Sequence, residues 1–215
     1  MHAARHPRRL LPRVLWVALF ALLTLASRSA PGTVAEQRAR LPPAAECAGK
    51  VEGKWKAQVY TAGEGAWYEF DLEIHKVPGS ETELTGLVHV HSWRGDPNQA
   101  SPGPCDGRLH YRGTMNGRGS YHDGDIAFGG SDFHLDETMC GEMGGYNPDQ
   151  FTGRIDERLQ EFQSVNNDGG QAVNEPTVFR RIGCFDEGPK ANADVTPPPY
   201  YPERRQGGCS CSVGE

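Results

Sequence analysis

The feature that most constrains the fold of this chain is a period of two in hydrophobicity. Between Tyr68 and His75, apolar residues alternate with charged or polar residues at every position. Because successive side chains of a β-strand point to opposite faces, this alternation predicts a strand with one apolar face. The same pattern recurs at residues 54–59, 84–91 and 108–115 and then in shorter pieces, and no window shows the period of a helix. With 27 Gly and 16 Pro in 215 residues, a helical bundle is disfavoured.

The alternating segments lie between Cys47 and Cys184 and number about eight. Turn signals separate them, among them Asp123-Gly124, Gly129-Gly130 and the run from Asn167 to Gly170. Each strand has one face to bury, and a sheet that closes on itself buries that face without leaving edges. We therefore predict an all-β domain, an antiparallel up-and-down barrel. A two-sheet β-sandwich is the alternative.

The apolar positions of these strands define the predicted interior, which comprises Trp55, Val59, Tyr68, Phe70, Leu72, Ile74, Leu84, Val88, Val90, Leu109, Tyr111, Met115 and Phe128. An eight-stranded barrel is either filled by its own side chains or holds one small ligand, and both outcomes remain open at this point. If a cavity exists, the polar tips of buried Trp and Tyr side chains need partners in it. The predicted ligand-binding wall is Trp55, Tyr68, Tyr111 and Phe128.

Residues 1–30 have the composition of a secretory signal peptide. Four arginines precede an apolar run of 13 residues from Val14 to Ala26. This run is shorter than the roughly 20 residues of a spanning helix, so we predict export and a mature chain without a membrane span. Residues 31–46 are predicted to be a linker before the barrel domain, residues 47–184.

The charge of the remaining chain argues against nucleic acid as a partner. Residues 1–30 contain five of the 22 Lys and Arg residues and none of the 28 Asp and Glu residues. Residues 31–215 therefore carry a net charge of −11. A phosphate backbone would be repelled by such a chain.

All six cysteines follow the predicted signal, and in an exported protein this predicts disulfides. Cys47 and Cys184 flank the strand region, and closure of a barrel with an even number of strands brings the start of the first strand beside the end of the last. Cys105 and Cys140 occupy predicted loops. We predict the bridges Cys47–Cys184 and Cys105–Cys140.

Four short motifs occupy strand positions: Gly53-Lys54-Trp55, Leu84-Thr85-Gly86, Phe151-Thr152-Gly153 and Phe179-Arg180-Arg181. This set resembles the calycin-like group of small barrels, the lipocalin and avidin types. The resemblance implies a rigid cup that binds a small molecule at its open end.

Three histidines are candidate metal ligands. His89 and His91 lie two residues apart on one predicted strand, so both imidazoles face the same side, and His110 on the next strand can join them. The arrangement suits zinc or copper, and the resemblance to periplasmic calycin-like proteins that bind zinc through histidines supports it. All three histidines fall on the polar face, so a solvent-exposed histidine surface is the alternative, and we expect no cofactor other than zinc.

Residues 185–215 are rich in Pro and Gly and predict a disordered tail. Its segment Gly207-Gly208-Cys209-Ser210-Cys211 resembles the cysteine-bearing start of the C-terminal sorting tails of myxobacterial surface proteins, here truncated. The resemblance implies surface attachment through Cys209 or Cys211. A local or intermolecular disulfide is the alternative.

No nucleophile with a base, no paired carboxylates and no open metal site appear as a sequence motif. We therefore expect a non-catalytic module, secreted, periplasmic or on the cell surface, that binds a small apolar or amphipathic ligand or a surface protein, in an oligomeric state that the sequence leaves open. The expected contacts are loops at residues 94–105, 140–148 and 166–172, because loops on a rigid scaffold carry binding residues. The alternatives are a structural or surface-displayed protein with a filled barrel, and a weakly zinc-binding periplasmic protein.

Overall fold

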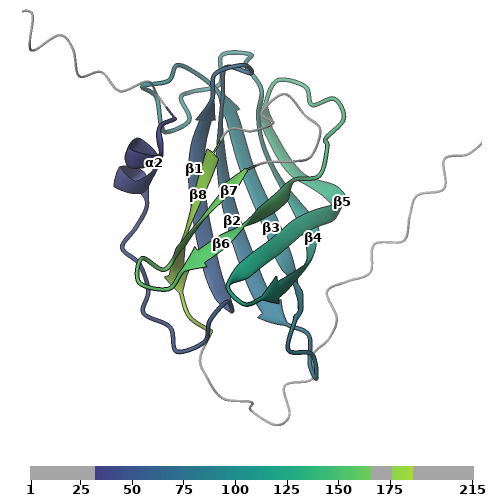
Figure 1. The fold of residues 1–215 in the computed structure, drawn as a ribbon. Helices are drawn as coiled ribbons and strands as arrows, with labels where there is room; N and C mark the ends of the chain where they lie inside the picture. The colour runs from purple at the N-terminus through teal and green to yellow at the C-terminus, as the bar shows by residue number, and fades with distance from the viewer. Residues whose placement is uncertain (1–31, 166–175, 186–215) are drawn as a thin grey trace, which may run out of the picture. The chain divides into compact units, whose positions relative to one another are not determined.

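The computed structural model describes residues 32–165 and 176–185, and within them the chain forms a closed antiparallel barrel of eight strands (Figure 1). Each strand pairs with its neighbour in sequence, and the first pairs with the last. The strands are β1 (Gly53–Thr61), β2 (Ala66–Lys76), β3 (Glu83–Arg94), β4 (His110–His122), β5 (Asp125–Cys140), β6 (Gln150–Asp156), β7 (Glu161–Val165) and β8 (Pro176–Gly183). The predicted up-and-down barrel is confirmed, and its closure excludes the sandwich. The architecture is compatible with a calycin-like fold.

Three predicted features lie outside the described residues. They are the signal segment at residues 1–30, the turn that begins at Asn167, and the tail with Cys209 and Cys211.

The β4–β5 hairpin confirms one predicted turn. His122 pairs with Asp125, and the two residues between them, Asp123 and Gly124, have φ angles of 50° and 94°. Positive φ at both central residues is the requirement of the type I′ turn, and Asp-Gly is among the sequences that adopt it most readily. The local sequence therefore sets the register of the two longest strands.

The second predicted turn is wrong, because Gly129 and Gly130 lie inside β5 and neither has a positive φ. Pairing of β5 with β6 ends at Gly129, after which β5 continues beside β4 alone. A Cβ atom at Gly130 would lie 2.4 Å from the sulfur of Met115. These glycines allow close packing in a long strand, and the sequence pattern of a turn was misleading for that reason.

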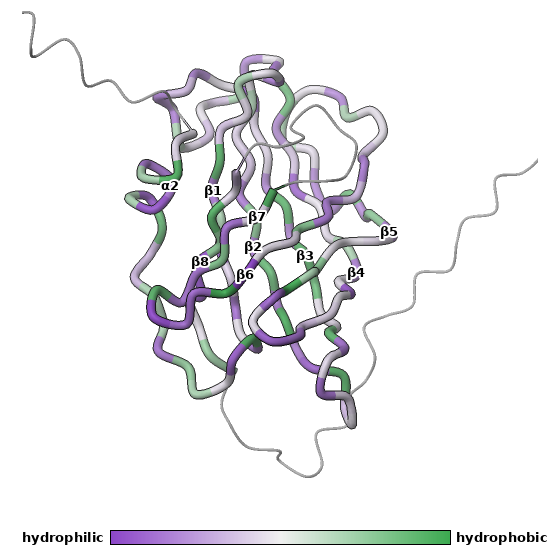
Figure 2. Tube along the Cα trace, viewed as in Figure 1, coloured by the Kyte–Doolittle hydropathy of each residue, from purple (hydrophilic) through white to green (hydrophobic). Residues whose placement is uncertain are grey.

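The apolar faces of the strands form one core inside the barrel. Hydrophobic and hydrophilic residues alternate along the strands (Figure 2), and every predicted interior residue is either buried in this core or packed against it. The predicted inward face is thereby confirmed.

The core is filled at the end of the barrel where β1 begins, which we call the closed end. The guanidinium of Arg181, 1% exposed, lies 5.0 Å from the Trp55 ring. It donates hydrogen bonds to the backbone carbonyls of Gly49, Lys50 and Glu52 at 2.6 to 3.2 Å. Trp55 Nε1 donates to the carbonyl of Val51 at 2.9 Å. These bonds pair both terminal nitrogens of the Arg181 guanidinium and the buried indole, whereas Arg181 Nε has no hydrogen-bond partner among the described residues. Residues 49–52 are thereby held across this end.

A short helix, α2 (Val34–Arg40), lies in the segment predicted to be a linker and contacts β8 and β1 (Figure 1). Thr33 and Glu36 form a capping box at its start. Gln37 is fully buried: its amide nitrogen donates to the carbonyls of Gly32 and Pro176, and its oxygen accepts from the Val178 N–H. The helix therefore completes the hydrogen bonding of β8 beyond its short pairing with β1, which spans Lys54 to Lys56. Seven residues are too few to give a helical period that a sequence window detects.

A second, smaller cluster of buried aromatic residues lies apart from the main core and consists of Tyr60, Trp67 and Trp93. The loop between β3 and β4 covers it, since Trp67 Nε1 donates to the carbonyl of Asp96 and Trp93 Nε1 to that of Gln99. We call residues 95–109 the covering loop.

Both predicted disulfides are present. Cys47 bonds to Cys184 across 137 residues, and Cys105 bonds to Cys140 across 35 residues. The first joins the two chain segments that flank the barrel, and the second joins the covering loop to the end of β5. Two disulfides are typical of a protein that folds in an oxidising, extracellular environment. No helix in the described residues is long and apolar enough to cross a membrane.

Candidate functional site

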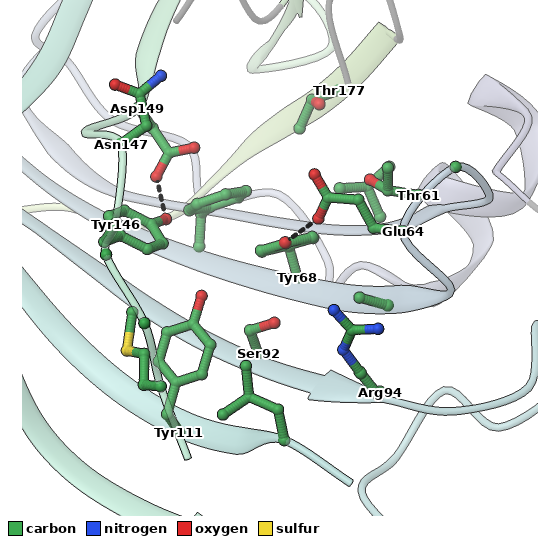
Figure 3. A pocket seen from close by; sticks show the side chains of 18 of the residues that line it. Thr61, Glu64, Tyr68, Ser92, Arg94, Tyr111, Tyr146, Asn147, Asp149 and Thr177 are labelled. Carbon is green, nitrogen blue, oxygen red and sulfur yellow. Dashed lines mark hydrogen bonds between the residues drawn. The ribbon is translucent and has the colours of Figure 1, made fainter. Parts of the chain in front are cut away.

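The end of the barrel opposite the closed end contains a cavity of about 620 Å³ (Figure 3). In an antiparallel meander the β1–β2, β3–β4 and β5–β6 connections all lie at this end, which we call the open end. The cavity is lined by the ends of β1, β2, β3 and β4, by Thr177 of β8, by the β1–β2 turn and by residues 142–149 before β6. The barrel is thus filled with side chains at one end and hollow at the other. The sequence left open whether the interior is filled or contains a cavity, and the structure has both, at opposite ends.

The structure divides the four predicted ligand-binding residues. Tyr68 and Tyr111 line the cavity, whereas Trp55 and Phe128 do not. Trp55 is fully buried at the closed end and Phe128 is 2% exposed in the core, against Gly117 of the neighbouring strand. The alternation of apolar and polar residues showed which residues face inward. It does not show whether an inward residue lies near the closed end or the open end of the barrel.

Two tyrosine–carboxylate pairs lie on opposite sides of the cavity (Figure 3). The Tyr68 hydroxyl of β2 donates to Glu64 in the β1–β2 turn, and the Tyr146 hydroxyl donates to Asp149, which immediately precedes β6. Asp149 is only 4% exposed. Burial is the largest cause that raises the pKa of both tyrosines, and their carboxylate partners raise it further. Both hydroxyls therefore stay protonated and act as donors to the carboxylates.

The third cavity tyrosine, Tyr111, is 3% exposed. Burial raises its pKa, a hydrogen bond with Ser92 on β3 opposes that rise, and the charges of Asp149 and Glu64 add to it. The negative charges of both carboxylates therefore affect the Tyr111 hydroxyl. Its ring packs edge-on against Tyr146, which in turn stacks on Phe133 with centroids 4.2 Å apart.

Sequence reasoning missed Glu64, Ser92, Asp149 and Thr177, and it included Tyr146 only as part of the predicted contact loop 140–148. Glu64 lies in a Gly-rich turn and Tyr146 and Asp149 in a Gly- and Pro-containing loop, where polar residues usually face solvent. Of the predicted contact loops, residues 140–148 supply part of the lining, and 166–172 lie outside the described residues. Residues 94–105 supply only Arg94, because the rest of that segment belongs to the covering loop.

The three candidate metal ligands separate into two groups on the outer face of the barrel. His91 Nε2 lies 2.8 Å from His110 Nε2, the distance of a hydrogen bond between two neutral imidazoles, whereas His89 Nδ1 lies 3.0 Å from the Thr114 hydroxyl. Burial, followed by the charge of Arg112, lowers the pKa of His91 to about 4. Among the described residues no group of three or more His, Cys, Asp or Glu side chains is arranged to hold a metal ion.

No family model, no curated protein and no solved structure matches this chain.

Proposed function

We propose that this protein is an exported, non-catalytic binding module that holds a small amphipathic ligand in the open-end cavity. The observation that carries the proposal is the cavity itself. Its volume of about 620 Å³ lies within the range of small-molecule sites, roughly 300 to 1,000 Å³.

The lining supports an amphipathic ligand over a purely apolar one. Val59, Phe70 and Leu109 supply apolar walls, and hydroxyls and carboxylates converge from several elements. A few polar groups placed among apolar walls are typical of sites that orient a ligand. The hollow end supports this proposal over the alternative of a structural protein with a filled barrel.

The chemistry of the lining favours binding over catalysis. Burial raises the pKa of Tyr68, Tyr111 and Tyr146, so at neutral pH their hydroxyls stay protonated and serve as fixed hydrogen-bonding groups for a ligand. Export is supported by the two disulfides and by the composition of residues 1–30.

A fragment screen by saturation-transfer NMR tests the proposal, with a library of neutral, cationic and anionic compounds. Ser92 is 3% exposed and lines the cavity, so Ser92→Phe places an aromatic ring in the cavity. The matched control is Ser120→Phe, an exposed position on β4 near the closed end. We expect fragments that bind the wild type and the control but not Ser92→Phe. Equal binding to all three proteins, or no binding to any, would contradict the proposal.

A further inference from the structure

The two tyrosine–carboxylate pairs of the cavity present hydrogen-bond acceptors to a ligand. The protons of the Tyr68 and Tyr146 hydroxyls are directed at Glu64 and Asp149, so the hydroxyl oxygens keep their lone pairs for a ligand. A carboxylate accepts hydrogen bonds at both oxygens and donates none. Within the described part of the chain, the Glu64 side chain has no hydrogen bond other than the one from Tyr68.

The charge of the lining also favours a ligand that donates hydrogen bonds, because it is mainly negative. Three of the described lining residues carry a carboxylate, Glu64, Glu142 and Asp149, and one carries a positive charge, Arg94. Arg94 ends β3 with an exposed side chain, whereas Asp149 is 4% exposed. Negative charge therefore extends into the protected part of the site, where low dielectric strengthens its interaction with a ligand.

Aromatic rings surround the same space. Tyr68 stacks parallel to Phe70 with ring centroids 6.0 Å apart, and Tyr111 and Tyr146 meet edge to face. The faces of such rings are negative and attract cations, and aromatic walls combined with acceptors are the usual means of binding ammonium groups.

We infer that the cavity binds a ligand that carries a protonated amine on an aromatic or apolar body. This inference rests on the proposed function, since it names the class of ligand that the same cavity takes. The amine donates to Glu64 and to the tyrosine oxygens, the charge of Asp149 adds to its attraction, and the body packs on the rings and on Val59 and Leu109.

Three compounds with one indole skeleton test the inference: tryptamine (cationic), tryptophol (neutral) and indole-3-propionate (anionic). Calorimetric titration of the protein at pH 7 measures their dissociation constants. We expect tryptamine to bind at least about tenfold more tightly than the other two. Glu64→Gln, which keeps size and hydrogen bonding, is expected to weaken tryptamine about fivefold and to leave tryptophol unchanged. The matched control is Glu81→Gln, since the Glu81 side chain is 94% exposed in the β2–β3 turn at the closed end.

The outcomes separate this inference from the proposed function. If tryptophol or indole-3-propionate binds as tightly as tryptamine and Ser92→Phe abolishes that binding, the cavity is a ligand site and the amine inference is wrong. The inference is also wrong if Glu64→Gln and Glu81→Gln weaken tryptamine equally. If none of the three compounds binds and the fragment screen finds no ligand that Ser92→Phe excludes, the proposed function itself fails.

Discussion

Gln37 contributes to the stability of the barrel at the place where β1 and β8 pair over only a few residues. It makes three hydrogen bonds from a fully buried position, to Gly32, Pro176 and the Val178 N–H. A buried backbone group without a partner costs about 1 to 3 kcal/mol, so this amide stabilises β8 where β1 no longer pairs with it.

We expect Gln37→Ala to lower the free energy of unfolding by about 2 to 3 kcal/mol, because it leaves buried backbone groups of β8 unsatisfied. Urea unfolding followed by tryptophan fluorescence measures the loss. Arg38→Ala on the same helix is the control, since the half-exposed Arg38 side chain donates to Glu161, which also pairs with Arg180. A Gln37→Ala protein no less stable than Arg38→Ala would contradict the account.

The His91–His110 pair makes stability depend on pH. A histidine in the unfolded chain has a pKa near 6.5, and burial lowers the pKa of His91 in the folded protein to about 4. The unfolded state therefore binds more protons between these values. The contribution of His91 to stability is complete above about pH 7 and is lost as the pH falls from 6.5 to 4.

We expect His91→Gln to reduce the stability difference between pH 7 and pH 4.5 by roughly 1 kcal/mol, a value that allows for solvent screening of this half-exposed site. Urea unfolding at the two pH values checks this, with His122→Gln, exposed at the end of β4, as the control. If His91→Gln and the wild type lose equal stability, the histidine pair does not titrate as argued.

Among the elements, the covering loop has a structural role that its sequence did not suggest. The sequence predicted binding contacts for residues 94–105, most of which belong to this loop. The structure shows that the loop buries Trp67 and Trp93, which are 1% and 3% exposed, and accepts hydrogen bonds from both indole N–H groups.

Replacement of residues 97–103 by a Gly-Ser segment of equal length is expected to destabilise the protein by about 2 kcal/mol or more, because it exposes part of two indole rings. Thermal unfolding and a red shift of tryptophan emission measure the effect. The control is substitution of Gly144 and Gly145 by serine in the β5–β6 loop, where both positions are exposed. Unchanged stability and emission after replacement of the covering loop would contradict its structural role.

Residues on the strands could be predicted from the sequence, whereas the contacts made by loop residues could not. Every interior residue that alternation predicted lies in the core or packs against it, although the prediction left out core residues of the later strands such as Phe162 and Phe179. The Asp123-Gly124 turn and both disulfides followed from local chemistry and closure. Glu64 and Asp149 escaped prediction because their roles depend on Tyr68 and Tyr146, contacts that exist only after the loops fold over the open end. Trp55 was assigned to the ligand site because alternation shows that it faces inward, but alternation does not show that it lies at the closed end, where Arg181 covers its ring.

At the scale of the whole molecule, closure depends on a short seam. β1 and β8 pair only between Lys54 and Lys56, and the Cys47–Cys184 disulfide lies beside this pairing. In the chain-entropy model, a bridge across 137 residues stabilises the fold by about 5 kcal/mol and one across 35 residues by about 4 kcal/mol.

We therefore expect the double variant Cys47→Ser, Cys184→Ser to lose about 5 kcal/mol of stability, because it frees both ends of the barrel in the unfolded chain. Urea unfolding under non-reducing conditions measures this against Cys105→Ser, Cys140→Ser. If removal of the seam disulfide costs less than removal of the loop disulfide, closure at the seam does not limit stability.

Locating a bound ligand decides whether the open end of the barrel is a ligand site. Tryptamine titrated into isotope-labelled protein, with amide and side-chain shifts assigned, gives that location. We expect saturable shifts concentrated at Glu64, Ser92, Tyr111 and Thr177, which line the cavity on four different elements. Shifts confined to the outer face around His89 and Arg112, or no saturable shifts, would contradict it.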